Sequence, residues 1–313
     1  MIKDRPGSQY LLSLTGGLGN QLFQLAAALY FAKGETIEVL QCFGAPRSTN
    51  GRADLLHFHL PENVIINEKV NSFILAKKVS GYMLRKGINP TGVERYRLYN
   101  ATCQIMASSY MSLYLSRKLK VFASDDVGFT ENHPIKNSLL LGYFQSYRYA
   151  INSDIKSCIR LYSEYQSSYF IDARNRISEL RPIIVHMRFK DYVNEPKFGM
   201  PDLDYYSKAI EYAITSVGIR PIWIFSDDNE MAKDKFIESK KLETVYFDSK
   251  DLTPAAVLEL MRFGSAYVIA NSTFSWWSAY LAYAETPTVV APRTWFKNLR
   301  EPRDIIPNSW KTL

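Results

Sequence analysis

The most informative part of the chain is Pro182-Ile183-Ile184-Val185-His186-Met187-Arg188-Phe189-Lys190-Asp191-Tyr192. Its apolar half follows a proline and predicts a short buried strand, after which polar side chains are released together. Ligands bind at the carboxyl ends of strands in open α/β sheets, and a guanidinium group such as that of Arg188 can bind phosphate oxygens in a bidentate way. The stretch therefore predicts an anion site. The alternative, in which Arg188 and Asp191 only pair with each other, stays open at this point.

The second half of the chain predicts a parallel, doubly wound sheet, because buried strands alternate with amphipathic helices. The strands are expected at 183–186, 221–225, 244–247, 266–270 and 288–291, and the helices at 204–217, 229–239, 254–263 and 274–284. The turn Asn271-Ser272-Thr273-Phe274 stands before the last helix and offers side-chain and backbone donors that suit a phosphate. The alternative is an ordinary helix cap.

The first half begins with a predicted strand at 10–14. The glycine turn Gly16-Gly17-Leu18-Gly19-Asn20 follows this strand, and an apolar helix then continues to Gly34. A second strand at 36–41 completes a β-α-β order. The glycine turn can present backbone N–H groups to a ligand. It is no dinucleotide fingerprint, because Leu22 occupies the position of the third glycine, and no P-loop lysine follows.

Another strand is expected from 139 to 146, with Tyr147-Arg148-Tyr149 continuing it. Tyr143 and Gln145 at its end suit a sugar, which stacks on an aromatic ring and hydrogen-bonds through its hydroxyls. A helix is predicted over 155–180, and the domain change is placed there, which gives domains of 1–160 and 161–313.

Asp202-Leu203-Asp204 spells the D-x-D of metal-dependent transferases, but Asp204 is more simply an N-cap of the following helix. No other carboxylate cluster and only four histidines are present, so we expect no metal cofactor. Three further carboxylates stand at strand ends and can accept hydrogen bonds from the N–H groups of a ligand: Asp227, Asp228 and Asp248.

Composition predicts a folded protein without a transmembrane helix, with 47% apolar and 22% charged residues among 313. The net charge is +7, of which residues 69–120 carry +9 and the remainder −2. That basic segment is a candidate for peripheral contact with an anionic membrane, or is a solvated helical face. No nucleic-acid-binding motif accompanies it. Without a signal peptide the protein is expected in the cytoplasm.

Five motifs together resemble those of the α-1,2-fucosyltransferases, glycosyltransferase family 11, in their bacterial form. In chain order they are Gly16 to Gln24, Gly142-Tyr143-Phe144-Gln145-Ser146, His186 to Tyr192, Phe225-Ser226-Asp227-Asp228 and Asn271 to Trp277. The resemblance implies a GT-B type fold, with two Rossmann-like domains facing a central cleft, the N-terminal one for the acceptor and the C-terminal one for the GDP-sugar. The departure from the family pattern is Phe189, where a second arginine is common, and Lys190 after it is a candidate partial substitute.

The resemblance also implies transfer of L-fucose from GDP-β-L-fucose to the 2-hydroxyl of a galactoside, with inversion, in surface-glycan synthesis. The implied acceptor is a galactoside, and a lipid-linked galactoside is one candidate. Arg188, Asn20, His186 and Asp191 are the implied catalytic residues. The implied donor-binding residues are Gly17, Leu18, Gly19, Asp227, Asn271, Ser272, Thr273 and Phe274, and the acceptor would meet Tyr143 and Gln145.

Three alternatives remain on the sequence alone. The first is a transferase of another GDP-deoxysugar, such as colitose, because its phosphate and guanine sites would look the same. The second is a non-catalytic carbohydrate-binding protein, and the third is a dinucleotide oxidoreductase. The general base stays open between Asp191 and acids near the N-terminal glycine turn, because the amide of Asn20 is not appreciably basic.

Overall fold

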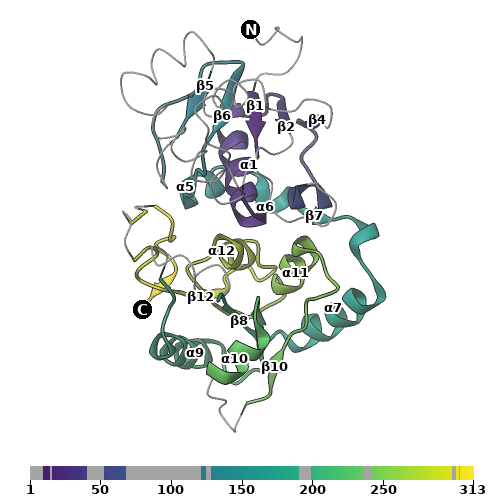
Figure 1. Ribbon diagram of the computed structural model, residues 1–313, viewed down its shortest axis with the longest axis vertical. Helices are drawn as coiled ribbons and strands as arrows, with labels where there is room; N and C mark the ends of the chain where they lie inside the picture. The colour runs from purple at the N-terminus through teal and green to yellow at the C-terminus, as the bar shows by residue number, and fades with distance from the viewer. Residues whose placement is uncertain are drawn as a thin grey trace, which may run out of the picture. The chain divides into compact units, whose positions relative to one another are not determined.

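The computed structural model describes residues 10–14, 16–40, 53–67, 121–124, 128–189, 199–235, 242–297, 301–302 and 304–313 (Figure 1). The predicted roles of Asp191, of Lys190 and of the basic segment 69–120 lie outside these ranges. The chain divides into two compact units, each built on an α/β sheet. Unit 1 comprises Met1–Arg160 and Pro302–Ile305, and unit 2 comprises Leu161–Glu301 and Ile306–Leu313.

Unit 1 is built on a parallel sheet with the strand order β4-β2-β1-β6-β5. Its strands are β1 (Tyr10–Ser13), β2 (Ile37–Leu40), β4 (Val64–Asn67), β5 (Val121–Ala123) and β6 (Ser138–Leu141). Its helices are α1 (Leu18–Ala32), the 3-10 helix η1 (Asp54–His57), α5 (Tyr147–Ile151) and α6 (Ile155–Cys158), and it also has the short strand β3 (Phe58–His59).

Helix α1 is buried over most of its length, because it is apolar on nearly all sides, and it packs against β1, β2, η1, α5 and α6. The helix ends at Lys33, which takes the left-handed conformation, and Gly34 follows with φ +88°. The short tail segment Pro302–Ile305 belongs to this unit, and the backbone N–H of Tyr147 donates to the carbonyl of Asp304 at 2.7 Å.

Unit 2 is built on a second parallel sheet, with the order β10-β9-β8-β11-β12-β13. The strands are β8 (Ile183–Met187), β9 (Ile222–Ser226), β10 (Thr244–Tyr246), β11 (Ala266–Val268), β12 (Thr288–Ala291) and β13 (Lys311–Thr312). The helices are α7 (Ser168–Leu180), α9 (Leu203–Val217), α10 (Asn229–Lys235), α11 (Pro254–Met261) and α12 (Thr273–Tyr280). The 3-10 helix η2 (Ser163–Tyr165) and the short strand β7 (Arg160–Leu161) precede α7.

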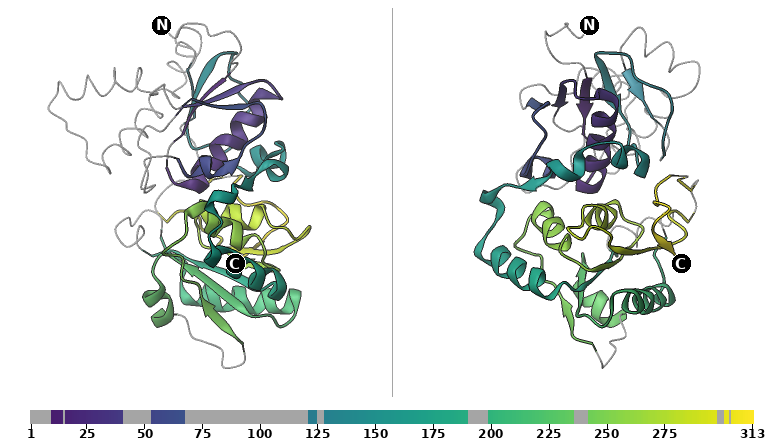
Figure 2. Two further views of the ribbon diagram at one scale, coloured as in Figure 1. Left: turned by 90° about the vertical axis from the view of Figure 1, so that its right-hand side faces the viewer. Right: turned by 180° about the vertical axis from the view of Figure 1, so that it is seen from behind.

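The two faces of strand β8 have different neighbours, because alternate residues of a strand point to opposite sides. Ile183, Val185 and Met187 join a buried cluster with helix α9, through residues such as Tyr206 and Ile210. His186 lies on the other face, where its ring is 5.9 Å from that of Phe274 at the start of α12. Figure 1 and Figure 2 show β8 with α9 on one side and α12 on the other.

The predicted strands and helices of unit 2 are confirmed, with α10 described as far as Lys235 and α12 ending at Tyr280. Four local predictions are wrong, and the first is the strand over 139–146, because β6 ends at Leu141. Tyr147-Arg148-Tyr149 begins helix α5 instead of continuing a strand, because Ser146 caps that helix by accepting from the N–H of Arg148. Residues 155–180 form no single helix: α6 ends at Cys158, and Ser167 caps the separate helix α7. The N-cap of α9 is Asp202 and not Asp204. The carboxylate of Asp204 pairs with Lys208.

A buried ion pair at the end of α11 is hydrogen-bonded to residues that follow α12. Arg262 donates to the carboxylate of Glu259 at 2.7 Å and to the carbonyl of Leu281 at 2.8 Å, and Tyr283 donates to the same carboxylate. Both charged groups are almost fully buried, so each needs the other to offset the loss of hydration. The cluster fixes the carboxyl end of α12, whose other end carries the predicted phosphate-binding turn.

Candidate active site

The candidate site of unit 2 lies where strands β8 and β9 end. The parallel register pairs Met187 with Ser226, so the next residue of each strand, Arg188 and Asp227, lie side by side. Arg188 Nε is 3.2 Å from Asp227 Oδ2, and the N–H of Phe189 donates to Asp227 Oδ1 at 2.8 Å. Both oxygens of this carboxylate are therefore engaged by the loop that follows β8. The ion-pair partner found for Arg188 in the described residues is Asp227, and Asp191 lies outside them.

His186 is buried directly before this loop and is uncharged at neutral pH. Burial, with the nearby positive charge of Arg188 as a second cause, lowers the pKa of its imidazole to about 3. The hydroxyl of Tyr206 donates to the carbonyl of His186 at 3.2 Å, which fixes the backbone at this point. His186 can therefore exchange neutral hydrogen bonds with a ligand, while the positive charge of the site comes from Arg188.

The start of helix α12 brings a second group of predicted residues to this edge of the sheet. Ser272 is the N-cap of α12 and makes no side-chain cap bond, and Thr273 and Phe274 form the first turn. The N–H groups of a helix's first turn have no partner within the helix, and the helix dipole favours an anion there. The contact between the rings of Phe274 and His186 places this turn beside the end of β8.

Asn271 has a structural task in this loop. Its side-chain amide donates to the carbonyls of Gly199 and Trp295, at 3.1 Å and 2.9 Å, and so ties three loops together. Both of these bonds use the amide nitrogen of Asn271, which holds the loops. A contact between Asn271 and the donor stays a prediction.

In unit 1, the glycine turn and the strand end after β6 are joined by side-chain amides. Gln145 donates to Asn20 Oδ1 at 2.7 Å, and Gln24 donates to the carbonyl of Gly142 at 3.0 Å. Gln21 donates to the carbonyl of Gly16 at 2.9 Å. Two motifs more than a hundred residues apart in sequence thus form one amide-rich patch, which can offer neutral hydrogen bonds to sugar hydroxyls.

The strand end at Gly142-Tyr143-Phe144-Gln145 has an unusual backbone. Phe144 has φ +50°, in the left-handed region that side chains rarely occupy, which costs on the order of 1–3 kcal/mol. Its fully buried ring packs among Phe31, Phe122 and Tyr149, which offsets this cost. The packing of Phe144 therefore sets the direction of Gln145, which is buried, and of the half-buried Tyr143 beside it.

The other predicted residues of unit 1 differ in what they can offer. Gly17 is exposed and precedes α1, whereas Leu18 and Gly19 are buried in the first turn of that helix. Leu18 and Gly19 can therefore act on a ligand only through their backbone N–H groups.

Asp54 is an acid that the motifs did not single out. It begins the helix η1, where the N–H of the next residue, Leu55, donates to Gln21 at 2.9 Å, one residue from Asn20. Burial raises the pKa of its carboxyl to about 6. Asp54 belongs to none of the motifs, and only its burial identifies it.

Neither a metal site nor a membrane span is seen in the described residues. No group of three or more His, Cys, Asp and Glu side chains that could hold a metal ion occurs among them. Over the same ranges, no helix has the length and apolar character needed to cross a bilayer.

Two units, each built on a parallel α/β sheet with polar strand ends, are the domain organisation of a GT-B type fold, and comparison with known proteins identifies the family. The profile of Glycosyl transferase family 11 matches residues 98–313, so the chain belongs to that family. The predicted family and fold class are thereby confirmed, and the oxidoreductase alternative is excluded.

Similar proteins agree with this assignment. The chain is 28% identical to the O-antigen biosynthesis glycosyltransferase WbnK of Escherichia coli, over 90% of this chain and 93% of that protein. It is 26% identical to an alpha-1,2-colitosyltransferase of Escherichia coli, over 91% of each. The fold is similar to that of the fucosyltransferase NodZ from Bradyrhizobium, with TM-score 0.52 and 14% identity over 88% of this chain and 93% of NodZ. POFUT1 in complex with GDP also gives TM-score 0.52, with 14% identity over 91% of this chain and 98% of POFUT1.

The buried neutral His186 predicts a loss of stability in acid. Its pKa in the folded protein lies below that of an exposed histidine, about 6.5. The unfolded chain therefore binds a proton that the folded chain does not as the pH falls from 6.5 toward 3, which costs up to about 1.4 kcal/mol per pH unit. We expect His186→Gln to lose this dependence, measured as the free energy of urea unfolding at several pH values.

Asp54 acts in the opposite direction, because its raised pKa favours the folded state as the pH falls through 6. This contribution is common to both proteins and cancels in the difference between wild type and His186→Gln. His59→Gln, at an exposed histidine, is the matched control. Parallel curves for the wild type and His186→Gln would show that His186 is not buried in the neutral form.

The close approach of Asn20 to Gly16 predicts that a side chain at position 16 would displace Asn20. Gly16 has φ +73°, and a Cβ added there would lie 2.5 Å from Asn20 Nδ2. Gly34 is a matched control, because its φ is +88° and a Cβ there meets no atom within 4 Å. Both alanine variants should lose on the order of 1 kcal/mol from the left-handed backbone. Only Gly16→Ala should also displace Asn20 and lower turnover, by about 100-fold for a shift near 1 Å.

The measurement is the melting temperature of each variant together with kcat in a glycosyl-transfer assay. Turnover equal to that of the wild type in both Gly16→Ala and Gly34→Ala would show that the position of Asn20 does not affect the reaction. A loss of turnover in both would assign the effect to the backbone conformation alone.

Proposed function

We propose that the protein transfers L-fucose from GDP-β-L-fucose to the 2-hydroxyl of a terminal galactoside, with inversion, to give an α-1,2 linkage in surface-glycan synthesis. The observation that carries the proposal is the convergence of Arg188, His186 and the first turn of α12 at one edge of the unit 2 sheet. Fucosyl transfer leaves negative charge on the departing GDP, and preorganised donors aimed at that charge lower the barrier most.

The division of charge between residues supports this role. Arg188 supplies a permanent positive charge, and the N–H groups at Ser272–Phe274 supply a partial one. His186 stays neutral, so it can hydrogen-bond without adding a charge that would bind the product GDP more tightly. These groups can stabilise the leaving diphosphate with no metal ion, which makes metal-independent transfer part of the proposal.

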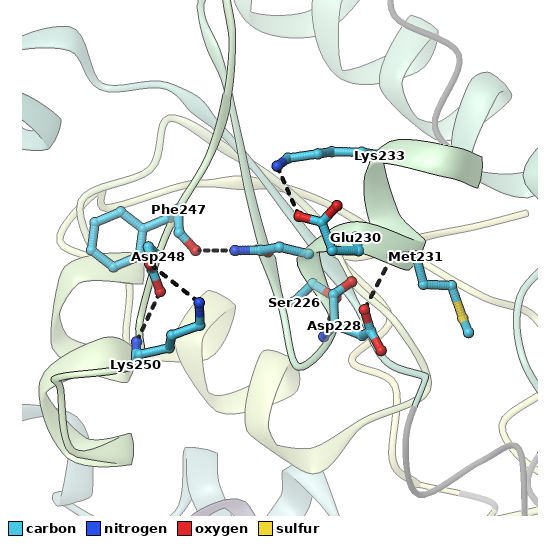
Figure 3. A network of polar contacts seen from close by, with 9 residues as sticks. Ser226, Asp228, Glu230, Met231, Lys233, Phe247, Asp248 and Lys250 are labelled. Carbon is cyan, nitrogen blue, oxygen red and sulfur yellow. Dashed lines mark hydrogen bonds and ion pairs between the residues drawn. The ribbon is translucent and has the colours of Figure 1, made fainter.

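Guanine recognition is proposed for Asp248. Asp227 is engaged by the loop after β8, and Asp228 accepts from the N–H of Met231 at 3.1 Å as the cap of helix α10 (Figure 3). Asp248 lies two residues beyond β10 and exposes 58% of its side chain, with Lys250 3.8 Å away. An exposed carboxylate at a strand end can accept from the N1–H and amino group of guanine.

Acceptor binding is proposed for the amide patch of unit 1, with Asn20, Gln145 and Tyr143. Neutral amides and a phenol hydrogen-bond sugar hydroxyls and leave the ring face for stacking. Asp191 and Asp54 are the candidates for the general base. A carboxyl whose pKa is raised to about 6, as in Asp54, is better suited to accept a proton near neutral pH than an unperturbed one.

The relatives favour a sugar of this class. WbnK is named for O-antigen biosynthesis, and the GDP complexes of NodZ and POFUT1 support a GDP-sugar donor. A second candidate donor is GDP-colitose, because one relative is an alpha-1,2-colitosyltransferase. A cytoplasmic location, and peripheral contact with the membrane through residues 69–120, stay predictions.

The test is a transfer assay with purified protein, a panel of β-galactosides and the donors GDP-fucose, GDP-colitose and GDP-mannose. We expect release of GDP and a fucosylated product with an α-1,2 linkage by NMR, at the same rate in excess EDTA. Arg188→Lys should lower kcat by about 10²–10³, because lysine lacks the bidentate donors.

Each other outcome corrects a named part of the proposal. Transfer from GDP-colitose alone would replace the donor, a 1,3 or 1,6 linkage would replace the acceptor hydroxyl, and a loss of rate in EDTA that Mg²⁺ restores would refute metal independence. Hydrolysis of the donor without transfer to any galactoside would contradict the acceptor class.

A further inference from the structure

We propose that Asp227 is a positioning residue that orients the guanidinium group of Arg188 through its charge. The inference rests on the proposed function, in which Arg188 holds the leaving diphosphate, and it gives Asp227 a role other than contact with the donor. The evidence is the geometry at the ends of β8 and β9, where the two residues lie side by side.

The contact uses one particular nitrogen of Arg188. Asp227 Oδ2 lies 3.2 Å from Nε, at the base of the guanidinium group. The two terminal nitrogens carry four of the five N–H donors of an arginine and can form an end-on bidentate contact with phosphate. A carboxylate bound at Nε therefore restricts the rotation of the planar group through a nitrogen that this end-on contact does not use.

The same carboxylate also fixes the backbone that carries Arg188. Asp227 Oδ1 accepts from the N–H of Phe189 at 2.8 Å, so one rigid group holds both the side chain of Arg188 and the residue after it. Two residues before Arg188, the carbonyl of His186 accepts from the hydroxyl of Tyr206. The chain from His186 to Phe189 is thus held at both ends, and a long flexible side chain in the middle is given one direction.

The partial exposure of the pair explains why an orienting charge is needed. The side chain of Arg188 is 29% exposed and that of Asp227 is 16% exposed. An arginine with this much access to water loses side-chain entropy when it binds a ligand, unless a partner has already restricted it. The neighbouring carboxylate, Asp228, cannot do this, because it caps helix α10 (Figure 3).

The experiment is a double-mutant cycle of Asp227→Asn and Arg188→Lys, with kcat, the KM for GDP-fucose and the melting temperature measured for all four proteins. Asparagine keeps an oxygen that can accept from the N–H of Phe189 and removes only the negative charge. We expect Asp227→Asn to lower kcat by about 10- to 100-fold in the wild-type background, as for a catalytic group displaced by up to about 1 Å. In the Arg188→Lys background it should change kcat less than about threefold, because its effect passes through Arg188.

The outcomes separate this inference from the function on which it rests. If Arg188→Lys keeps normal kcat, the proposed function fails first. If Arg188→Lys is impaired while Asp227→Asn is normal, or if Asp227→Asn lowers kcat by the same factor in both backgrounds, only the positioning role fails. Should Asp227→Asn not fold, Asp227→Glu in the same cycle serves, since it keeps the charge and displaces it by one methylene. Its kcat should fall in the wild-type background only, and equal losses in both would reject the inference.

Discussion

The parallel pairing of strand β8 with β9 on one side and β11 on the other is the constraint on which the candidate site depends. Parallel strands end at the same edge of a sheet, so the residues that follow β8, β9 and β11 meet there whatever their distance in sequence. The register sets Arg188 against Asp227. The alternation of faces directs His186 away from helix α9 and toward Phe274, in the first turn of α12. Shifting the register by one residue would exchange the two faces and dismantle the site.

The two units offer a ligand different chemistry. Unit 2 has a permanent charge at Arg188, a helix N-terminus and a buried neutral imidazole, which suit a diphosphate whose charge increases as it leaves. The described part of unit 1 offers the neutral amides of Asn20 and Gln145, held by glycines and by the strained backbone at Phe144. Such groups suit hydroxyls. This division matches the separate binding of donor and acceptor in the proposed transfer reaction.

Much of unit 2 could be predicted from the sequence, because runs such as 183–186 and 288–291 are apolar, short and bounded by turn residues. The end of β8 was predictable as a candidate site for the same reason. The contact between Arg188 and Asp227 was not, since nothing in one strand encodes the register of its neighbour. Asp54 has no motif, so only its burial distinguishes it.

Local predictions failed where two signals competed. Aromatic residues at Tyr147 and Tyr149 favour a strand by propensity, but the cap at Ser146 starts a helix. In the same way, scattered apolar positions over 155–180 fit a helix, although α6 ends at Cys158 and Ser167 caps α7. Asp202 and Asp204 both lie at the start of α9, and the side chain that reaches the N–H of Tyr205 is that of Asp202. Caps therefore overrode periodicity at each of these points.

In the proposed reaction Arg188 binds the terminal phosphate of GDP, and the most direct test of this role is calorimetric binding of GDP and GMP to the wild type and to Arg188→Ala. The two ligands differ by that phosphate alone. A charge-assisted contact of this kind contributes about 1.5–3 kcal/mol, so the wild type should bind GDP at least about tenfold more tightly than GMP. The variant should lose most of that preference while keeping its affinity for GMP. An unchanged ratio of the two affinities in Arg188→Ala would contradict the claim.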